Sequence, residues 1–117
     1  MIQIQASLDR KGCLKTLEAK GHANTLRGGY SPVCAGVTTL LRTGAELFLT
    51  EQGIKAEVLA PQEGVMEIRV LSIPEEGIQR SQGLTDFLIF GLQRLALEAP
   101  DQVTVRCIRE EGDTYGT

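Results

Sequence analysis

The sequence is poor in the residues that enzymes most often use for chemistry. Its 117 residues include one His, three Cys and no Trp. The Cys stand far apart, at positions 13, 34 and 107, and no Cys-x-x-Cys pair occurs. A single His leaves no second imidazole to complete a conventional zinc site. We therefore expect no bound metal and no other cofactor, and any chemistry that needs an imidazole depends on His22.

Long apolar runs and an excess of positive charge are missing as well. No stretch approaches the roughly 20 apolar residues of a membrane span, and residues 1–5 do not resemble a signal peptide. The net charge of -3 argues against a protein that binds nucleic acid by neutralising phosphates. Scattered Cys without a leader indicate a reducing compartment. We expect a cytoplasmic protein that binds neither membrane nor nucleic acid, with an acidic balance that suits a basic partner.

The 42% of hydrophobic residues are enough for one core. We expect a single domain over residues 1–109 and a polar C-terminal tail over 110–117. Side chains that alternate between apolar and polar predict strands in five segments, which are residues 2–8, 13–21, 54–60, 65–71 and 103–108.

Two further segments have apolar residues at helical spacing. The first helix is expected to begin with Ser31 as N-cap and Pro32 at its first position, and to end at Gly53. The second is expected over about 78–99, before Pro100. Its predicted buried stripe is Leu84, Phe87, Leu88, Leu92, Leu95 and Ala96.

The element order is therefore strand, strand, helix, strand, strand, helix, strand. Short connections at residues 9–12 and 61–64 indicate two hairpins. This predicts an α+β fold, a mostly antiparallel sheet with two helices on one face. The other face then needs water or a partner, which suggests a homodimer.

Cys34 stands out because it would be the third residue of the first helix. Unpaired backbone N–H groups and the positive end of the helix dipole stabilise a thiolate there, which makes a cysteine nucleophilic. The alternative is a small buried residue, since free Cys is often buried. Cys13 follows a hairpin turn and lacks this context, and Cys107, in line with Val103 and Val105, is explained by packing.

His22 ends the strand that leads toward this helix, so its imidazole is expected to approach the thiol of Cys34. A cysteine nucleophile needs such a base to hold the thiolate and later to protonate a leaving amine. The alternative is an exposed loop His without a role. Asp9, Glu18 and Asp86 are scattered, so the sequence nominates no carboxylate to orient the imidazole.

The segment Gly21-His22-Ala23, followed by Val33-Cys34-Ala35 and Val37, resembles the ribosomal-processing cysteine protease (Prp) family. The resemblance implies a homodimeric cytoplasmic endopeptidase that removes an N-terminal extension from the precursor of a large-subunit ribosomal protein. It makes Cys34 the nucleophile and His22 the base. A loop that includes Gly28, Gly29, Tyr30 and Ser31, together with Thr38, would contact the substrate peptide.

The sequence departs from the family pattern at three positions. Ser31 replaces a usual acidic residue, Pro32 replaces an aliphatic one, and Thr38 replaces a Ser while keeping the hydroxyl. The Ser31-Pro32 pair supports an alternative, a non-catalytic ribosome-associated binding module of the same fold. A redox sensor based on Cys34 is a weaker alternative, because no resolving Cys is near in sequence.

Overall fold

The computed structural model describes residues 1–21 and 31–110. The order of strands and helices is the expected one, with a single 3₁₀ turn, Glu75–Gly77, added before the second helix. Residues 111–117 of the expected tail lie outside the described residues. The elements are β1 (Ile2–Leu8), β2 (Leu14–Gly21), α1 (Pro32–Thr50), β3 (Lys55–Leu59), β4 (Val65–Ser72), α2 (Ile78–Glu98) and β5 (Val103–Arg109).

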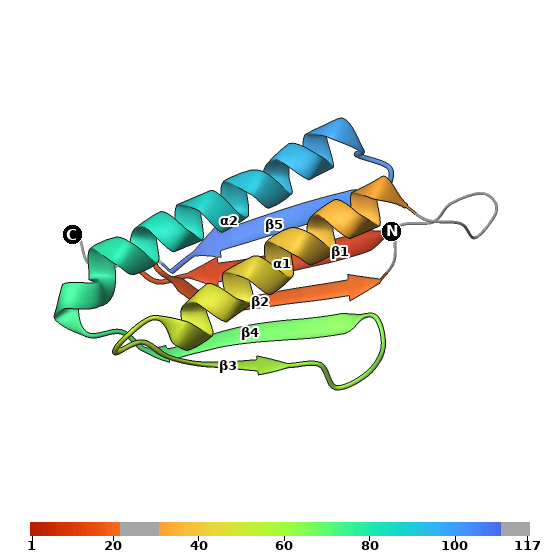
Figure 1. The fold of residues 1–117 in the computed structure, drawn as a ribbon. Helices are drawn as coiled ribbons and strands as arrows, with labels where there is room; N and C mark the ends of the chain where they lie inside the picture. The colour runs from red at the N-terminus through yellow and green to blue at the C-terminus, as the bar shows by residue number, and fades with distance from the viewer. Residues whose placement is uncertain (22–30, 111–117) are drawn as a thin grey trace.

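The five strands form one sheet in the order β3-β4-β2-β1-β5, and both helices lie on the same face of it (Figure 1). Three of the four strand pairs are antiparallel, and β1 and β5 are parallel. The predicted α+β fold is confirmed. The parallel pair was not foreseen, because β5 joins the sheet beside the first strand rather than beside its neighbour in sequence. Neither helix, over the ranges described, is long and apolar enough to cross a membrane.

Alternation along β1 and β2 places their apolar side chains under the helices. On β2, Leu17 and Ala19 are buried as predicted. The register shifts at the hairpin end, where Leu8 lies opposite Leu14 and the preceding pair is Ser7 with Thr16. Because this irregularity leaves an extra residue in β2, Leu14 is also buried although it is three positions before Leu17.

The helices pack closely against each other at two glycines. A Cβ at Gly44 would lie 3.0 Å from the side chain of Leu88, and one at Gly91 would lie 3.0 Å from that of Leu40. The absence of these side chains lets the two backbones approach. The shared core under the helices includes Phe48 and Leu92, both fully buried.

Two details of the helix predictions were wrong. Phe87, placed on the buried stripe of the second helix, is 70% exposed. The buried face of α2 is rotated toward Ser81 and Thr85, two small polar residues that the apolar pattern could not signal. The first helix ends at Thr50 with Glu51 as C-cap, and Gly53 follows with a positive φ of 85° in the turn beyond it.

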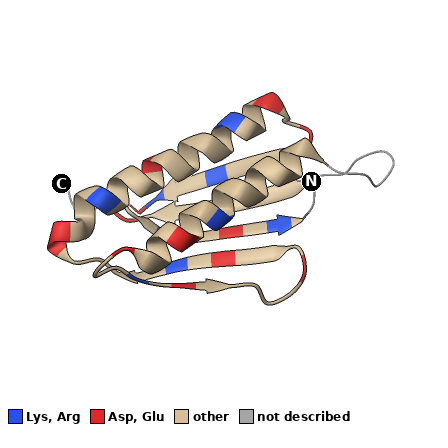
Figure 2. Ribbon diagram, viewed as in Figure 1, with Lys and Arg blue, Asp and Glu red and all other residues tan. Residues whose placement is uncertain are grey.

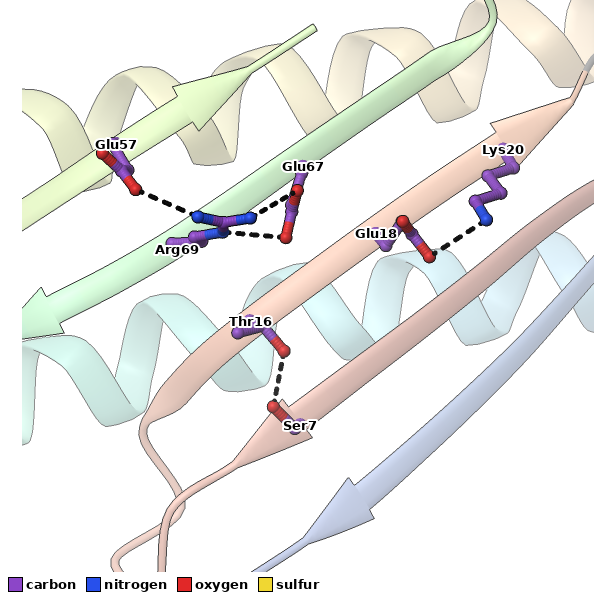
Figure 3. A network of polar contacts seen from close by, with 7 residues as sticks. All are labelled: Ser7, Thr16, Glu18, Lys20, Glu57, Glu67 and Arg69. Atoms are coloured by element: carbon purple, nitrogen blue, oxygen red, sulfur yellow. Dashed lines mark hydrogen bonds and ion pairs between the residues drawn. The ribbon is translucent and has the colours of Figure 1, made fainter. Parts of the chain in front are cut away.

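The uncovered face of the sheet carries a network of polar side chains (Figure 3), together with the exposed apolar residues Leu71 and Ile108. Ser7 and Thr16 share a hydrogen bond of 2.6 Å, and Arg69 donates to Glu67 at 2.9 Å. The polar network on this face is suited to water. The exposed apolar side chains of the helical layer instead include Phe87, Phe90 and Leu97 on α2. The homodimer stays a prediction.

Candidate active site

Cys34 occupies the predicted place in the first turn of α1. The Ser31 N-cap has extended backbone angles, φ -107° and ψ 118°, and its hydroxyl oxygen accepts a hydrogen bond from the Cys34 N–H at 3.2 Å. The N–H of Ala35 donates to the carbonyl of Ser31 at 3.0 Å. The Ser-Pro start therefore forms the cap that the sequence predicted, with Cys34 at its third helical position.

The same cap limits the backbone donors near the thiol. Pro32 has no N–H, and the amides of Cys34 and Ala35 donate to Ser31. The amide of Val33 is the one in this first turn for which the described residues supply no acceptor. Within residues 1–21 and 31–110, the Val33 N–H is thus the one first-turn donor that the cap does not use, and the Cys34 N–H becomes free only if the Ser31 hydroxyl turns away.

A cavity of about 460 Å³ lies beside Cys34, between α1 and the strands under it. Its helical wall includes Cys34, Thr38 and Arg42, which are four residues apart and therefore share one face of α1. The wall opposite comes largely from the β3–β4 hairpin: Val58, Ala60, Gly64, Val65 and Met66. An opening of this size beside a thiol can hold part of a peptide.

Gly21, the last residue of β2, lines the same cavity. Its φ is +100°, and a Cβ there would collide with the carbonyl oxygen of Met1. Its N–H donates to the carbonyl of Gly64 at 2.8 Å. These contacts fix the backbone immediately before His22. The end of β2 and the start of α1 lie at the same end of the molecule (Figure 1), as the sequence predicted.

The predicted site residues are only partly within the described ranges. His22, Gly28, Gly29 and Tyr30 lie outside the described residues. The other two predicted substrate contacts differ from each other: Thr38 lines the cavity, and Ser31 is 93% buried as the helix cap and does not.

Several cavity residues were missed by the sequence analysis. Arg42 could have been found, because it is eight positions after Cys34 and thus on the same side of the helix. Gly64 and Met66 gave no local signal, since they reach the cavity only through the pairing of β2 with β4.

The two other thiols have environments that suppress reactivity. Cys13 is 1% exposed, and burial raises its thiol pKa, with a smaller opposing contribution from the hydroxyl of Ser81. Burial also raises the thiol pKa of half-buried Cys107, opposed by the charge of Arg109. A raised pKa keeps a thiol in its unreactive protonated form. All three Cys are free thiols.

The cavity lining contains none of Asp9, Glu18 and Asp86, so no carboxylate among them is placed to orient an imidazole there. Within the described ranges, no group of three His, Cys, Asp or Glu side chains is arranged to hold a metal ion.

Solved structures of two similar proteins share this architecture over nearly the whole chain. SMU.848 from Streptococcus mutans is 25% identical, with a TM-score of 0.77, and the match covers 94% of this chain and 96% of that one. The essential ribosomal processing protease Prp from Staphylococcus aureus, in complex with a covalently linked product peptide, is 18% identical. Its TM-score is 0.77, over 92% of this chain and 99% of that one.

The S. aureus protease has also been solved in complex with a substrate peptide, with a TM-score of 0.73. At this identity the likeness is one of fold. No curated protein matches the chain. The family model for the cysteine protease Prp does match, over residues 1–104. Because that match spans most of the 117 residues, the chain belongs to the cysteine protease Prp family.

Proposed function

We propose that this chain is a cysteine endopeptidase in which Cys34 is the nucleophile and His22 the base. One observation carries the proposal: Cys34 and Gly21, the residue before His22, line the same cavity. The backbone of Gly21 is held by its hydrogen bond to Gly64. The residue that precedes His22 therefore lies at the cavity that Cys34 lines.

In the proposed reaction the Cys34 thiolate attacks the carbonyl carbon of the scissile peptide bond. The electron pair of the C=O bond moves to oxygen, and the Val33 N–H is the proposed donor to the resulting oxyanion. The protonated imidazole of His22 gives its proton to the leaving nitrogen as the C–N bond breaks. His22 then takes a proton from water, which attacks the thioester, releases the new carboxyl group and restores the thiol.

The proposed substrate is the precursor of a large-subunit ribosomal protein, from which an N-terminal extension is removed. Support comes from membership of the Prp family and from the S. aureus ribosomal processing protease, which has been solved with a substrate peptide. The cavity runs beside two turns of α1, a shape that suits an extended peptide. Substrate contacts are proposed for Gly28, Gly29, Tyr30, Ser31 and Thr38, in a cytoplasmic homodimer.

The direct test is cleavage of the purified precursor, followed by mass spectrometry. Cys34→Ala and His22→Ala are expected each to lower cleavage by at least about a thousandfold, with unchanged circular dichroism. Cys107→Ala is the matched control and should cleave like the unmodified protein, because its half-buried thiol faces the core rather than the cavity. Cleavage that persists in a Cys34 or His22 variant would remove that residue from the mechanism.

A second candidate, a binding module that holds the precursor without cutting it, is favoured by one observation. Pro32 and the Ser31 cap leave a single first-turn amide for an oxyanion. Binding of the precursor without product after prolonged incubation would support this candidate. Product that depends on Cys34 would exclude it.

A further inference from the structure

We propose that two copies of this chain associate through a stripe of side chains on the outer side of α2, with the two helices antiparallel across a two-fold axis near Phe90. The α2 stripe consists of Gly83, Phe87, Phe90, Arg94 and Leu97. The proposed function includes a homodimer without naming its surface, which this stripe would supply. The stripe shares no residue with the cavity beside the nucleophile, so the association and the proposed cleavage are tested separately.

The apolar members of the α2 stripe are strongly exposed in the single chain. Phe87 and Phe90 are each 70% exposed, and Leu97 is 77% exposed. Phe90 is two positions from the buried Leu88 and from the buried Leu92, which is about 200° around the helix, so it points away from the sheet. Burial of such large apolar side chains is favourable, and their grouping on one helix indicates a surface that a partner covers.

The spacing of the α2 stripe matches the packing of one helix along another. Its members follow each other at intervals that alternate between four and three residues, a pattern that keeps side chains on one line and lets two helices interlock over several turns. Gly44 and Gly91 face side chains of the neighbouring helix, whereas a Cβ at Gly83 would meet nothing within 4 Å among the described residues. Gly83 therefore leaves room for a side chain of a second helix.

The exposed area is compatible with a stable dimer. At about 200 Å² for each large side chain, the three apolar members of the stripe present about 400 Å² in one chain and about 800 Å² in two. Stable interfaces bury about 1,200–2,000 Å² in total. Exposed neighbours on α2, such as Asp86 and Gln93, would supply the remainder.

Charges on α2 favour the antiparallel arrangement. Positive and negative residues alternate along the helix (Figure 2), in the order Arg80, Asp86, Arg94 and Glu98. Two antiparallel helices that cross near Phe90 bring Arg94 of each copy beside Asp86 of the partner subunit, whereas parallel helices bring like charges together at a cost in free energy. The pair of Arg94 with Glu98, at 3.3 Å, is exposed and therefore weak, so Arg94 can turn toward a partner.

The test is the oligomeric state of the purified full chain. Light scattering after size-exclusion chromatography and sedimentation velocity measure it over protein concentrations from about 1 to 100 μM, and the unmodified protein should have the mass of two chains. Phe90→Glu places two carboxylates side by side at the two-fold axis and should weaken association at least about a hundredfold. Ile108→Glu is the matched control, because Ile108 is 53% exposed but lies on the uncovered face of the sheet, and it should remain a dimer.

An exchange of charges tests the orientation of the two helices. Asp86→Arg and Arg94→Asp should each weaken the dimer about tenfold, because each puts like charges together at two symmetric places in the interface. The double variant should regain most of the lost affinity, and both effects should shrink as the salt concentration rises. Absence of this rescue would show that the helices are not antiparallel.

A monomer at about 100 μM would leave the α2 stripe to a different partner and overturn the proposal. A dimer that persists in Phe90→Glu, or that is lost as much in Ile108→Glu, would place the interface elsewhere and overturn it as well. Circular dichroism checks that each variant is folded, with Leu97→Glu as a second disruption of the stripe. Failure of the proposed function looks different: the dimer forms and responds to Phe90→Glu, but the ribosomal precursor is not cleaved.

Discussion

Two thiols near opposite ends of the β1–β2 hairpin, Cys13 at its turn and Cys34 on α1, have opposite surroundings. At the turn, Cys13 is covered by the start of α2: its Sγ lies 3.7 Å from the carbonyl oxygen of Ile78, and the next amide, of Leu14, donates to Thr85 at 2.9 Å. At the other end, Cys34 begins a helix and lines a cavity. At both ends the β1–β2 hairpin lies near the start of a helix. The helix covers the thiol at the turn, which we call the closed end, whereas a cavity lies beside the thiol at the other, open end.

This difference teaches that the reactivity of a thiol depends on which backbone groups are left without partners around it. At the closed end, the Asp9 carboxylate accepts from the amides of Lys11 and Cys13, both at 2.9 Å, so the turn's donors are used internally. At the open end, the Ser31 cap accepts from the amides of Cys34 and Ala35, and the Val33 amide has no acceptor among the described residues.

The largest effect that tests this contrast is thiol alkylation. With iodoacetamide at pH 7.5, Cys34 should be labelled more than about a hundredfold faster than Cys13, because Cys13 must first be uncovered by local opening that costs about 3 kcal/mol. Time-resolved peptide mass spectrometry measures the three rates in one sample. Cys107 should fall between the two. Equal rates for Cys34 and Cys13 would show that the two ends do not differ as described.

Glycine substitutions at the two ends come next in size. Both Gly21 and Gly12 have positive φ, which any other residue adopts at a cost of roughly 1–2 kcal/mol. A Cβ at Gly21 meets the backbone of Met1, whereas one at Gly12 meets only the flexible end of Arg109. We therefore expect Gly21→Ala to lower the free energy of unfolding by more than about 3 kcal/mol and Gly12→Ala by about 1–2 kcal/mol.

Urea unfolding followed by circular dichroism measures both glycine variants. If Gly21→Ala is no more destabilising than Gly12→Ala, the backbone before His22 is not fixed as the structure indicates. Cleavage should be lost in Gly21→Ala and retained in Gly12→Ala below the unfolding transition.

The helix cap gives a smaller effect. Ser31→Ala removes the acceptor for the Cys34 amide and should cost about 1 kcal/mol of unfolding free energy. Ser31→Asp keeps a cap of similar strength but adds a negative charge, which disfavours the Cys34 thiolate. It should therefore preserve stability while slowing alkylation of Cys34 several-fold, most at low salt. Equal alkylation rates in Ser31→Asp and the unmodified protein would contradict the electrostatic part of this argument.

The smallest expected effect is a pH dependence from Cys13. Burial raises its pKa in the folded protein, so the folded state retains the proton longer than the unfolded state. The stability from the neutral buried thiol is complete below roughly pH 8.5, where an exposed thiol ionises, and is lost as the pH rises toward the folded pKa. The stability advantage over Cys13→Ala should narrow by less than about 1 kcal/mol between pH 8 and 10. If the difference in unfolding free energy between the unmodified protein and Cys13→Ala widened over this range, the pKa of Cys13 would be lowered by folding rather than raised.

Local patterns predicted the elements well, because each depends on its own residues. The Ser31-Pro32 start of α1 and the alternation of β1 were both legible from a few neighbouring positions. The pairing of strands across the sheet could not be read from neighbouring positions in this way. The pairing of Ile2 with Val103 depends on side-chain packing between segments at opposite ends of the chain, and no periodicity encodes it.

The candidate site divides in the same way. Cys34 and Thr38 could be found from the helix that they share. Arg42 lay on that face too, but its relevance depends on the apolar wall that the β3–β4 hairpin places across the cavity. The exposure of Phe87 could not be predicted for a related reason. Ser81 and Thr85 lie on the buried face of α2, and small polar residues do not mark a buried face in the apolar pattern.

The parallel pairing of β1 with β5 also determines when the sheet can be completed during synthesis of the chain. β1 lies inside the sheet, between β2 and β5, so its second edge is satisfied only by Val103–Arg109. A nascent chain that has produced α1 and the cavity residues still has this edge open. The sheet closes only after β5 has left the ribosome, and such distant pairing forms late.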